Sequence, residues 1–264
     1  MLLAYLKTIF RNIKRHKGYS AINIAGLSIG IALFLMIMLF VQDEYSYDRF
    51  NENLERIYRI ELGTGCVMPT GIGHILKGQI PEIEKIVRFY PSYGEDYLIK
   101  YNENYIKLPN FVYADSSVFD VFTIPFTAGN PETALANPFA MVVTESTAKR
   151  IFGSENPIGR TILVDNRWDF TITGIIRDVE KFHIPIDAIA SFVSLIDIWG
   201  VKDFSQLDDD YAYPTYVLLP AEHDAAAVGQ EVNTWLNENH NFSENSEFKL
   251  RPLKGLYFLN EKLM

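Results

Sequence analysis

The longest uninterrupted apolar stretch of the chain runs from Ala21 to Val41 and contains no charged residue. As a helix this stretch would span roughly 31 Å, which matches the hydrocarbon thickness of a bilayer. Its length, and the absence of a small-residue cleavage pattern after it, favour an uncleaved membrane helix over a secretory signal peptide. The pattern therefore predicts a transmembrane helix over residues 21–41.

The two flanks of this predicted helix differ in charge. The preceding twenty residues contain only basic charges, at Lys7, Arg11, Lys14, Arg15 and Lys17. The residues that follow the helix begin with acidic side chains at Asp43, Glu44 and Asp48. Because basic flanks are retained on the cytoplasmic side, we expect residues 1–20 in the cytoplasm and all residues after Val41 outside it.

Residues 2–13 carry leucine, isoleucine and phenylalanine at helical spacing, with basic residues on another face. This pattern predicts an amphipathic elbow helix that lies in the cytoplasmic membrane interface. Residues 17–20 are expected to bend from this helix into the span, with Ser20 as the N-cap of the membrane helix.

Small side chains recur inside the predicted span at Gly26, Ser28 and Gly30. Small residues four positions apart allow a second helix to approach closely, so this face is a candidate for helix packing. The alternative is that these residues have no special role, because glycine is common in membrane helices. A packing face would require a helix from another subunit or from a further part of the protein.

The pattern changes twice after the span. Tyr47, Phe50 and Leu54 recur at helical spacing, which predicts an amphipathic stalk over residues 42–56. From Ile57 the spacing shifts to alternation, which predicts a first strand over residues 57–62 and a folded domain over residues 57–264.

The rest of the chain alternates between short apolar strands and a few helical stretches. Strands are predicted at 83–90, three times within 96–114, and at 140–143, 161–164, 168–176, 186–193, 215–219 and 247–253. Helices are predicted at 70–79, 144–152 and 221–239, whereas 128–131 and 194–213 are expected to be irregular. With roughly nine or ten strands and two or three helices, the expected fold is one transmembrane helix followed by a mixed α+β extracytoplasmic domain.

Composition narrows the choice of partners. The 264 residues are 48% hydrophobic and carry a net charge of −9. Since the first 41 residues contribute five positive charges and no negative ones, the remainder carries −14. An acidic domain of this kind argues against nucleic-acid partners. Cys66 is the only cysteine, which excludes an internal disulfide, and a buried structural thiol is favoured over a reactive one.

No group of residues has the spacing of a catalytic or metal site. The five histidines and Cys66 lack metal-ligand spacing, and His183 is expected to be an ordinary surface residue of a loop. The glycine-rich stretches near residues 63–73 and 153–159 do not match a nucleotide-binding loop. We therefore expect no enzymatic activity, no metal and no cofactor bound by this chain.

Several segments carry motifs in a fixed order: N-I-x-G-L-S-I-G in the span, D-E-x-S-Y-D-x-F and R-I-Y-R after it, D-S-S-V-F-D-V-F at 115–122, and further matches at 143–153, 156–160, 173–179 and 215–219. Together they make the chain resemble the FtsX-like, MacB-type ABC transporter permeases, especially those of Bacteroidota. The resemblance covers nearly the whole chain.

The resemblance implies an inner-membrane permease that works as a dimer with an ABC ATPase, which binds the ATP. It also implies a MacB-like periplasmic core domain with a porter-like part and an inserted mixed part. In such permeases ATP-driven motion of the membrane helices is transmitted to the periplasmic domain, where substrate is exported or extracted, in some cases with a periplasmic or outer-membrane partner.

Two expectations follow for this chain. No later apolar stretch is long enough to span a membrane, whereas the resembling permeases have three further spans, so the chain is expected to be a portion of a longer permease or a truncated product. The alternative hypothesis is a single-span anchored periplasmic domain that binds and regulates an envelope protein without transport.

Overall fold

The structure is a computed structural model that describes residues 11, 14–63, 65–92, 94–204, 211–239 and 247–259. The chain divides into two compact units, Met1–Ser46 and Tyr47–Met264. Most of the amphipathic elbow helix predicted at residues 2–13 lies outside the described residues.

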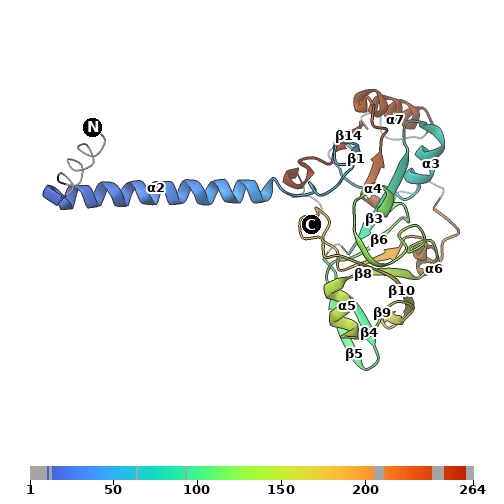
Figure 1. Ribbon diagram of the computed structural model, residues 1–264. Helices are drawn as coiled ribbons and strands as arrows, with labels where there is room; N and C mark the ends of the chain where they lie inside the picture. Colours follow the sequence, from blue (N-terminus) through green and yellow to red (C-terminus); the bar gives the residue numbers. More distant parts are fainter. Residues whose placement is uncertain are drawn as a thin grey trace. The chain divides into compact units, whose positions relative to one another are not determined.

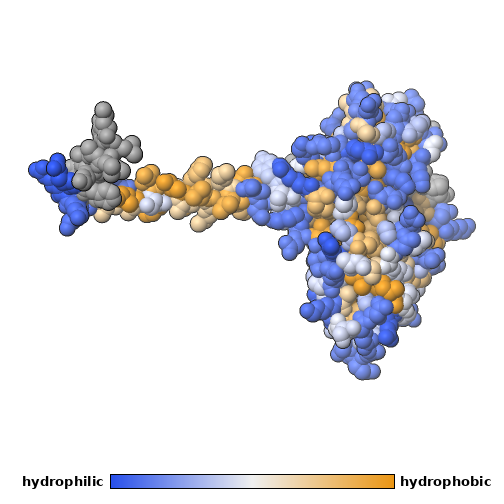
Figure 2. Space-filling model, viewed as in Figure 1, coloured by the Kyte–Doolittle hydropathy of each residue, from blue (hydrophilic) through white to orange (hydrophobic). Residues whose placement is uncertain are grey.

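The first unit contains one long helix, α2 (Lys17–Glu44), which includes the whole predicted span (Figure 1). It is the one helix of the described chain that is long and apolar enough to cross a membrane. None of its residues is buried, and Figure 2 shows apolar surface along its length. The expectation that Ser20 caps the helix is wrong, because its N–H donates to the His16 carbonyl 2.9 Å away, inside a helix that has already begun. No proline interrupts residues 17–20, and one glycine costs a helix only about 1 kcal/mol.

The second unit is a mixed α/β domain, which confirms the expected α+β class. Its strands are β1 (Ile57–Leu62), β2 (Met68–Pro69), β3 (Lys85–Pro91), β4 (Tyr97–Tyr101), β5 (Asn104–Leu108), β6 (Phe111–Ala114), β7 (Phe126–Gly129), β8 (Ala140–Thr144), β9 (Thr161–Val164), β10 (Trp168–Ile176), β11 (Ala188–Ser191), β12 (Tyr211–Tyr213), β13 (Thr215–Leu218) and β14 (Phe248–Pro252). Its helices are α3 (Ile72–Gln79), α4 (Val118–Val121), α5 (Glu145–Phe152), α6 (Ser194–Trp199), α7 (Ala225–Asn239) and the short 3-10 helix η1 (Leu256–Leu259).

Most described strands join one sheet in the order β14-β1-β13-β3-β6-β11-β8-β10-β9-β4-β5, and β7 pairs with β10. Strand β3 belongs to both halves of this sheet, because its residues 85–88 pair with β13 and its residues 89–91 pair with β6. We call β14, β1, β13 and β3, with helices α3 and α7, the first part. The second part comprises β6 and the strands beyond it, with the helices α4, α5 and α6, and it is built from residues between those of the first part (Figure 1).

Alternation along the strands creates three hydrophobic cores. In β13, Tyr216 and Leu218 face one core that extends along both parts, whereas Val217 faces a second core under α3 and α7. In β6, Val112 faces the shared core and Phe111 faces a third core under α5. Side chains on a strand point alternately to opposite faces, so both parts bury both faces of their sheet.

Local signals in the sequence account for several boundaries. The Thr144 hydroxyl oxygen accepts a hydrogen bond from the Thr147 N–H at 3.2 Å, which confirms the expected N-cap of α5. Three residues separate the paired Val164 and Trp168, and the first two, Asp165 and Asn166, have φ of 50° and 53°, as the central residues of a type I′ turn do.

Three sequence expectations differ from the structure. Residues 42–44 continue helix α2, but residues 45–50 and 52–56 form turns, so the helical course expected for the stalk is wrong beyond Glu44. Residues 128–131 were expected to form a loop, but Ala128 and Gly129 belong to β7 and pair with β10. The irregular region expected at 194–213 contains helix α6 and strand β12, while residues 205–210 lie outside the described part.

Candidate functional site

The turns that follow α2 are fixed to the domain by side chain–backbone hydrogen bonds. We call residues 47–56 the connecting segment. The Asn51 amide oxygen accepts from the Thr123 N–H at 2.9 Å, and the Glu52 N–H donates to the Thr123 hydroxyl at 2.9 Å. Further along, the Arg56 Nε donates to the Leu219 carbonyl at 2.8 Å. The segment therefore follows the domain surface through specific polar contacts rather than as an independent helix.

Asp48 is the most buried charged residue of this segment, with 1% of its surface exposed. Its backbone has a φ of 61°, a left-handed conformation that aspartate tolerates better than most residues. Its N–H donates to the Lys181 carbonyl at 2.7 Å, and its Oδ1 accepts from the His183 N–H at 3.3 Å. Asp48 is thus bound to the loop between β10 and β11 by backbone and side-chain atoms.

The His183 ring continues from Asp48 into the domain. Its Nδ1 lies 2.8 Å from Asp48 Oδ1, and its Nε2 lies 2.7 Å from the Tyr216 hydroxyl. A carboxylate only accepts, so the His183 Nδ1 carries a proton toward Asp48, and Nε2 lies within hydrogen-bond distance of the Tyr216 hydroxyl. The expectation that His183 is an ordinary surface residue is wrong, because its side chain is 0% exposed.

Tyr216 lies on β13, in the shared core, and is fully buried. Burial raises the pKa of the Tyr216 hydroxyl above its usual range, the Arg59 charge lowers it, and the Asp48 charge raises it further. The hydroxyl therefore stays protonated at neutral pH.

A buried ion pair extends this chain of contacts to the edge of the sheet. Arg59 and Glu61 are two residues apart on β1, and their Nη2 and Oε1 atoms lie 2.6 Å apart. Only 3% and 10% of these two side chains are exposed. The other carboxylate oxygen of Glu61 accepts from Arg251 on β14 at 3.1 Å. We call Asp48, His183, Tyr216, Arg59 and Glu61 the Asp48 relay.

The predicted stalk residues lie at the start of this relay. The Tyr47 ring stacks on Tyr257 of η1, with centroids 3.6 Å apart and planes 10° apart. Phe50 and Leu54 pack against the shared core, with Phe50 edge-on to Phe182 at 5.9 Å. These side chains are therefore attached to the domain, and their role in transmission stays a prediction.

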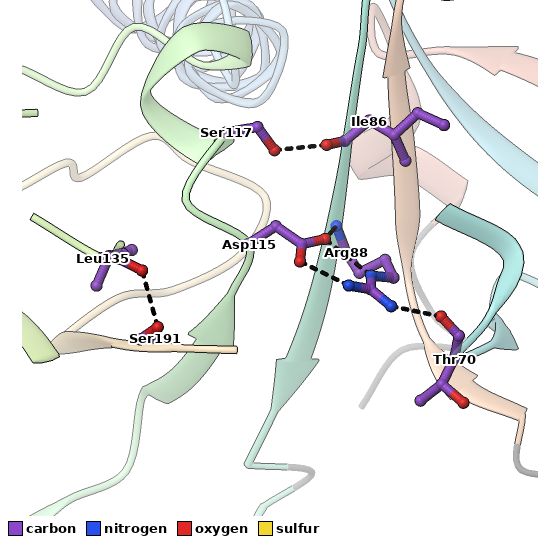
Figure 3. Close-up of polar contacts among 7 residues, drawn as sticks. All are labelled: Thr70, Ile86, Arg88, Asp115, Ser117, Leu135 and Ser191. Atoms are coloured by element: carbon purple, nitrogen blue, oxygen red, sulfur yellow. Dashed lines mark hydrogen bonds and ion pairs between the residues drawn. The ribbon is translucent and has the colours of Figure 1, made fainter. Parts of the chain in front are cut away.

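A second, partly buried polar contact joins the two parts of the domain. Arg88, on β3, binds the Asp115 carboxylate through Nε at 2.8 Å and Nη2 at 2.7 Å, and its Nη1 donates to the Thr70 carbonyl at 2.6 Å (Figure 3). Its guanidinium also lies 4.2 Å from the ring centroid of Phe192. A Cβ atom at Gly73 would lie 3.1 Å from Arg88 Cδ, so glycine there allows α3 to approach this side chain. Arg88 thus connects α3 and β3 to the ends of β6 and β11.

Several residues of the family-like motifs turn out to make such contacts. Asp48 belongs to D-E-x-S-Y-D, and Asp115 begins the motif at 115–122. In that second motif the Ser117 hydroxyl donates to the Ile86 carbonyl at 2.5 Å (Figure 3). In the segments at 143–153 and 173–179 the Ser146 hydroxyl donates to Asp178. The motifs therefore mark junctions between segments that are distant in sequence.

The predicted membrane residues have no partner within the described chain. A Cβ atom at Gly26 or Gly30 would meet no other atom within 4 Å, and Ser28 is exposed. Of the basic flank, Lys7 lies outside the described residues, and the others are exposed: Arg11, Lys14, Arg15 and Lys17. Their proposed roles stay predictions.

Sequence reasoning missed most of the relay, although signals for it existed. His183 stands between apolar neighbours in Phe182-His-Ile184, which is the pattern of a buried segment. Arg59 and Glu61 interrupt an apolar strand at positions that share one face, as a paired buried ion would. Cys66 is buried, as expected. Among the residues the structure describes, no three histidine, cysteine or acidic side chains are placed to hold a metal.

Comparison with known proteins gives one family and a set of related folds. The family model for the MacB-like periplasmic core domain matches residues 20–235. No curated protein sequence matches the chain.

Among solved structures, a domain of a protein assigned as a permease in Porphyromonas gingivalis aligns with a TM-score of 0.65 and 16% identity, over 76% of this chain and 92% of that one. The periplasmic region of MacB from Actinobacillus actinomycetemcomitans aligns with a TM-score of 0.59 and 14% identity, over 80% of this chain and 95% of that one. The extracellular domain of the ABC-type transporter YknZ from Gram-positive bacteria aligns with a TM-score of 0.54 and 15% identity, over 74% and 98% of the two chains. At these identities the three structures show that the fold is shared.

Proposed function

The chain belongs to the family of MacB-like periplasmic core domains of ABC-type transporter permeases, and on that premise we propose that it transmits ATP-driven motion from the membrane to its periplasmic domain. In this proposal α2 spans the inner membrane, with the basic residues before it in the cytoplasm and the domain in the periplasm. The charge difference between the flanks of α2 supports this orientation.

The observation that carries the proposal is the Asp48 relay. Only Tyr45 and Ser46 separate the end of α2 from the connecting segment. Asp48 and Asn51 are 1% and 4% exposed, and both are hydrogen-bonded to other segments of the domain. A displacement of the connecting segment must therefore move His183 and β13 with it or break buried hydrogen bonds, which costs about 1 to 3 kcal/mol for each group left unpaired.

The other components of the proposed machine lie outside this chain. An ABC ATPase binds and hydrolyses ATP, so this chain has no cofactor and no catalytic residues of its own. A second permease copy packs against the face formed by Gly26, Ser28 and Gly30, because small side chains permit close helix approach. The domain then handles an exported or extracted substrate, together with any periplasmic or outer-membrane partner.

The direct test is copurification of the native permease, tagged at its N-terminus, from membranes in mild detergent. We expect an ABC ATPase to be recovered in stoichiometric amount, with an ATPase rate that rises when the permease is present. Recovery of an envelope protein with no ATPase would contradict the proposal and favour a single-span anchored binding domain.

A further inference from the structure

A groove of about 540 Å³ opens where the two parts of the domain meet. Its volume lies within the range of roughly 300 to 1,000 Å³ that is typical of small-molecule sites, and such sites occur preferentially between domains. None of the five relay residues lines this groove. It is therefore a feature separate from the relay.

The basic side chains of the groove come from one wall. Lys77 lies in the last turn of α3, and Lys85 and Arg88 lie on β3. All three belong to the first part of the domain. Among the described lining residues, this wall has no acidic side chain.

The acidic side chains come from the opposite wall. Asp115 directly follows β6, Asp120 lies on α4, and Glu132 lies in the turns after β7. All three belong to the second part, and no basic side chain lines this wall in the described chain. The groove thus separates charges of opposite sign across the boundary between the two parts.

Two ion pairs already cross the groove. Arg88 and Asp115 are 2.7 Å apart and largely buried, which makes this pair a fixed part of the floor. Lys85 and Asp120 are 2.8 Å apart, but 46% and 47% of these side chains are exposed, so this pair is weak and opens readily.

The third pair of opposite charges is not closed. Lys77 and Glu132 are both exposed, and neither side chain makes an ion pair or hydrogen bond with another residue of the described chain. One cation and one anion therefore remain available on opposite walls.

We propose that this groove binds a zwitterionic ligand, with its anionic group toward Lys77 and Lys85 and its cationic group toward Glu132 and Asp120. A ligand with one sign of charge would be repelled by one wall, and an apolar ligand would leave desolvated charges unpaired. Because the two ends of the ligand contact different parts of the domain, its binding holds the first part against the second.

This inference does not depend on coupling to an ATPase. A failure of ligand binding and a failure of ATPase copurification are measured separately and are therefore distinguishable.

Isothermal titration calorimetry of the full chain in the non-ionic detergent dodecyl maltoside tests the proposal. Trialanine provides a soluble zwitterion, and N-acetyl-trialanine and trialanine amide each lack one charge. Glycerophosphoethanolamine provides the zwitterion of a lipid headgroup. We expect at least one zwitterion to bind about tenfold more tightly than either singly charged tripeptide. The better of the two zwitterions then identifies the source as peptide-like or lipid-derived.

Charge-reversal variants locate the binding. Lys77→Glu and Glu132→Lys should each weaken binding about tenfold. Lys149→Glu is the matched control, since Lys149 is also an exposed lysine in the last turn of an eight-residue helix, α5. The substituted positions Lys77, Glu132 and Lys149 are all exposed, so we expect each variant to fold.

Three outcomes would overturn the proposal. The first is no binding of either zwitterion. The second is binding of a singly charged tripeptide as tight as that of the better of the two zwitterions. The third is an effect of Lys77→Glu no larger than that of Lys149→Glu.

Discussion

Helix α2 and the connecting segment are adjacent in sequence, yet they differ in the burial and hydrogen bonding of their side chains. No residue of α2 is buried, and no described residue faces its glycines. In the connecting segment Asp48 and Asn51 are almost completely buried and hydrogen-bonded. The domain therefore holds buried side chains of the connecting segment, whereas no side chain of α2 is buried in the described structure.

This contrast is consistent with the proposal that residues 47–56 transmit motion of α2 to the domain. In the proposed transmission, α2, which has no buried residue, would move with its surroundings, and the connecting segment, fixed by buried polar groups, would pass that movement to the domain. The predictions below test each side of the contrast, in order of their expected effect on the stability of the domain.

Removing the carboxylate at the start of the relay should have the largest effect. Asp48→Ala leaves two buried His183 donors without an acceptor and places alanine at a φ of 61°, so we expect a loss of about 3 kcal/mol in the free energy of unfolding. Asp48→Asn keeps an acceptor oxygen and tolerates this conformation, so its cost should be about 1 kcal/mol. Urea denaturation measures both. Equal losses in the two variants would mean that the relay does not depend on the Asp48 acceptor.

The next largest effect should come from the junction between the two parts. Arg88→Met keeps much of the apolar stem but leaves the Asp115 carboxylate without its guanidinium, so we expect a loss of about 2 kcal/mol. Arg88→Lys keeps the charge and loses the bidentate geometry, and it should restore about half of that loss. The same urea titrations serve as the measurement. A methionine variant as stable as the wild type would show that this contact does not hold the parts together.

Alkaline pH should lower the stability of the domain through the buried hydroxyl of Tyr216. Since burial raises its pKa in the folded domain, the stability from this shift is present below the unfolded pKa of about 10 and is lost as pH rises above it. We expect unfolding free energy to fall above pH 10, and Tyr216→Phe to make this slope shallower by up to about 1.4 kcal/mol per pH unit. Stability measured at pH 9 to 11.5 gives the slopes. Identical slopes in the two proteins would contradict a buried, protonated hydroxyl.

Substitutions in α2 should have the smallest effect on the domain. Gly26→Leu with Gly30→Leu should leave membrane insertion and domain stability unchanged, because no described residue packs on these glycines. In the native permease the same change should disrupt helix assembly, as seen by blue native electrophoresis. Ile31→Leu is the control on the same helix. Intact assembly in the glycine variant would exclude the packing face.

The sequence predicted what depends on local pattern. Alternation identified β1 at its observed bounds, and the threonine and glycine at the ends of α5 identified that helix. Strand β7 was missed because its pairing depends on a distant contact, where Gly129 and Gly174 let two backbones meet and a Cβ atom at Gly129 would lie 2.5 Å from the Thr173 carbonyl oxygen. The resemblance to a permease family predicted a domain of two parts in which one part is inserted into the sequence of the other.

The relay could not be predicted from the sequence for a related reason. Asp48 and His183 are 135 residues apart, and neither residue carries a local signal of the other. Tyr47, Phe50 and Leu54 have helical spacing, yet the segment forms turns, because buried bonds from Asp48, Asn51 and Arg56 to the domain outweigh helix propensity. The groove was missed because its charged walls meet only in the folded domain.

The most direct test of transmission compares hydrogen exchange in the native permease and in Asp48→Ala, each assembled with its ATPase. Amide exchange is measured by mass spectrometry without nucleotide and with ATP and vanadate, which trap the ATPase. We predict that trapping changes exchange in the wild type both in residues 47–56 and in the loop that contains His183. In Asp48→Ala, which removes the acceptor for His183, the change should remain in residues 47–56 and be lost from the His183 loop. A wild-type domain that does not respond, or a variant that responds fully, would contradict transmission through the Asp48 relay.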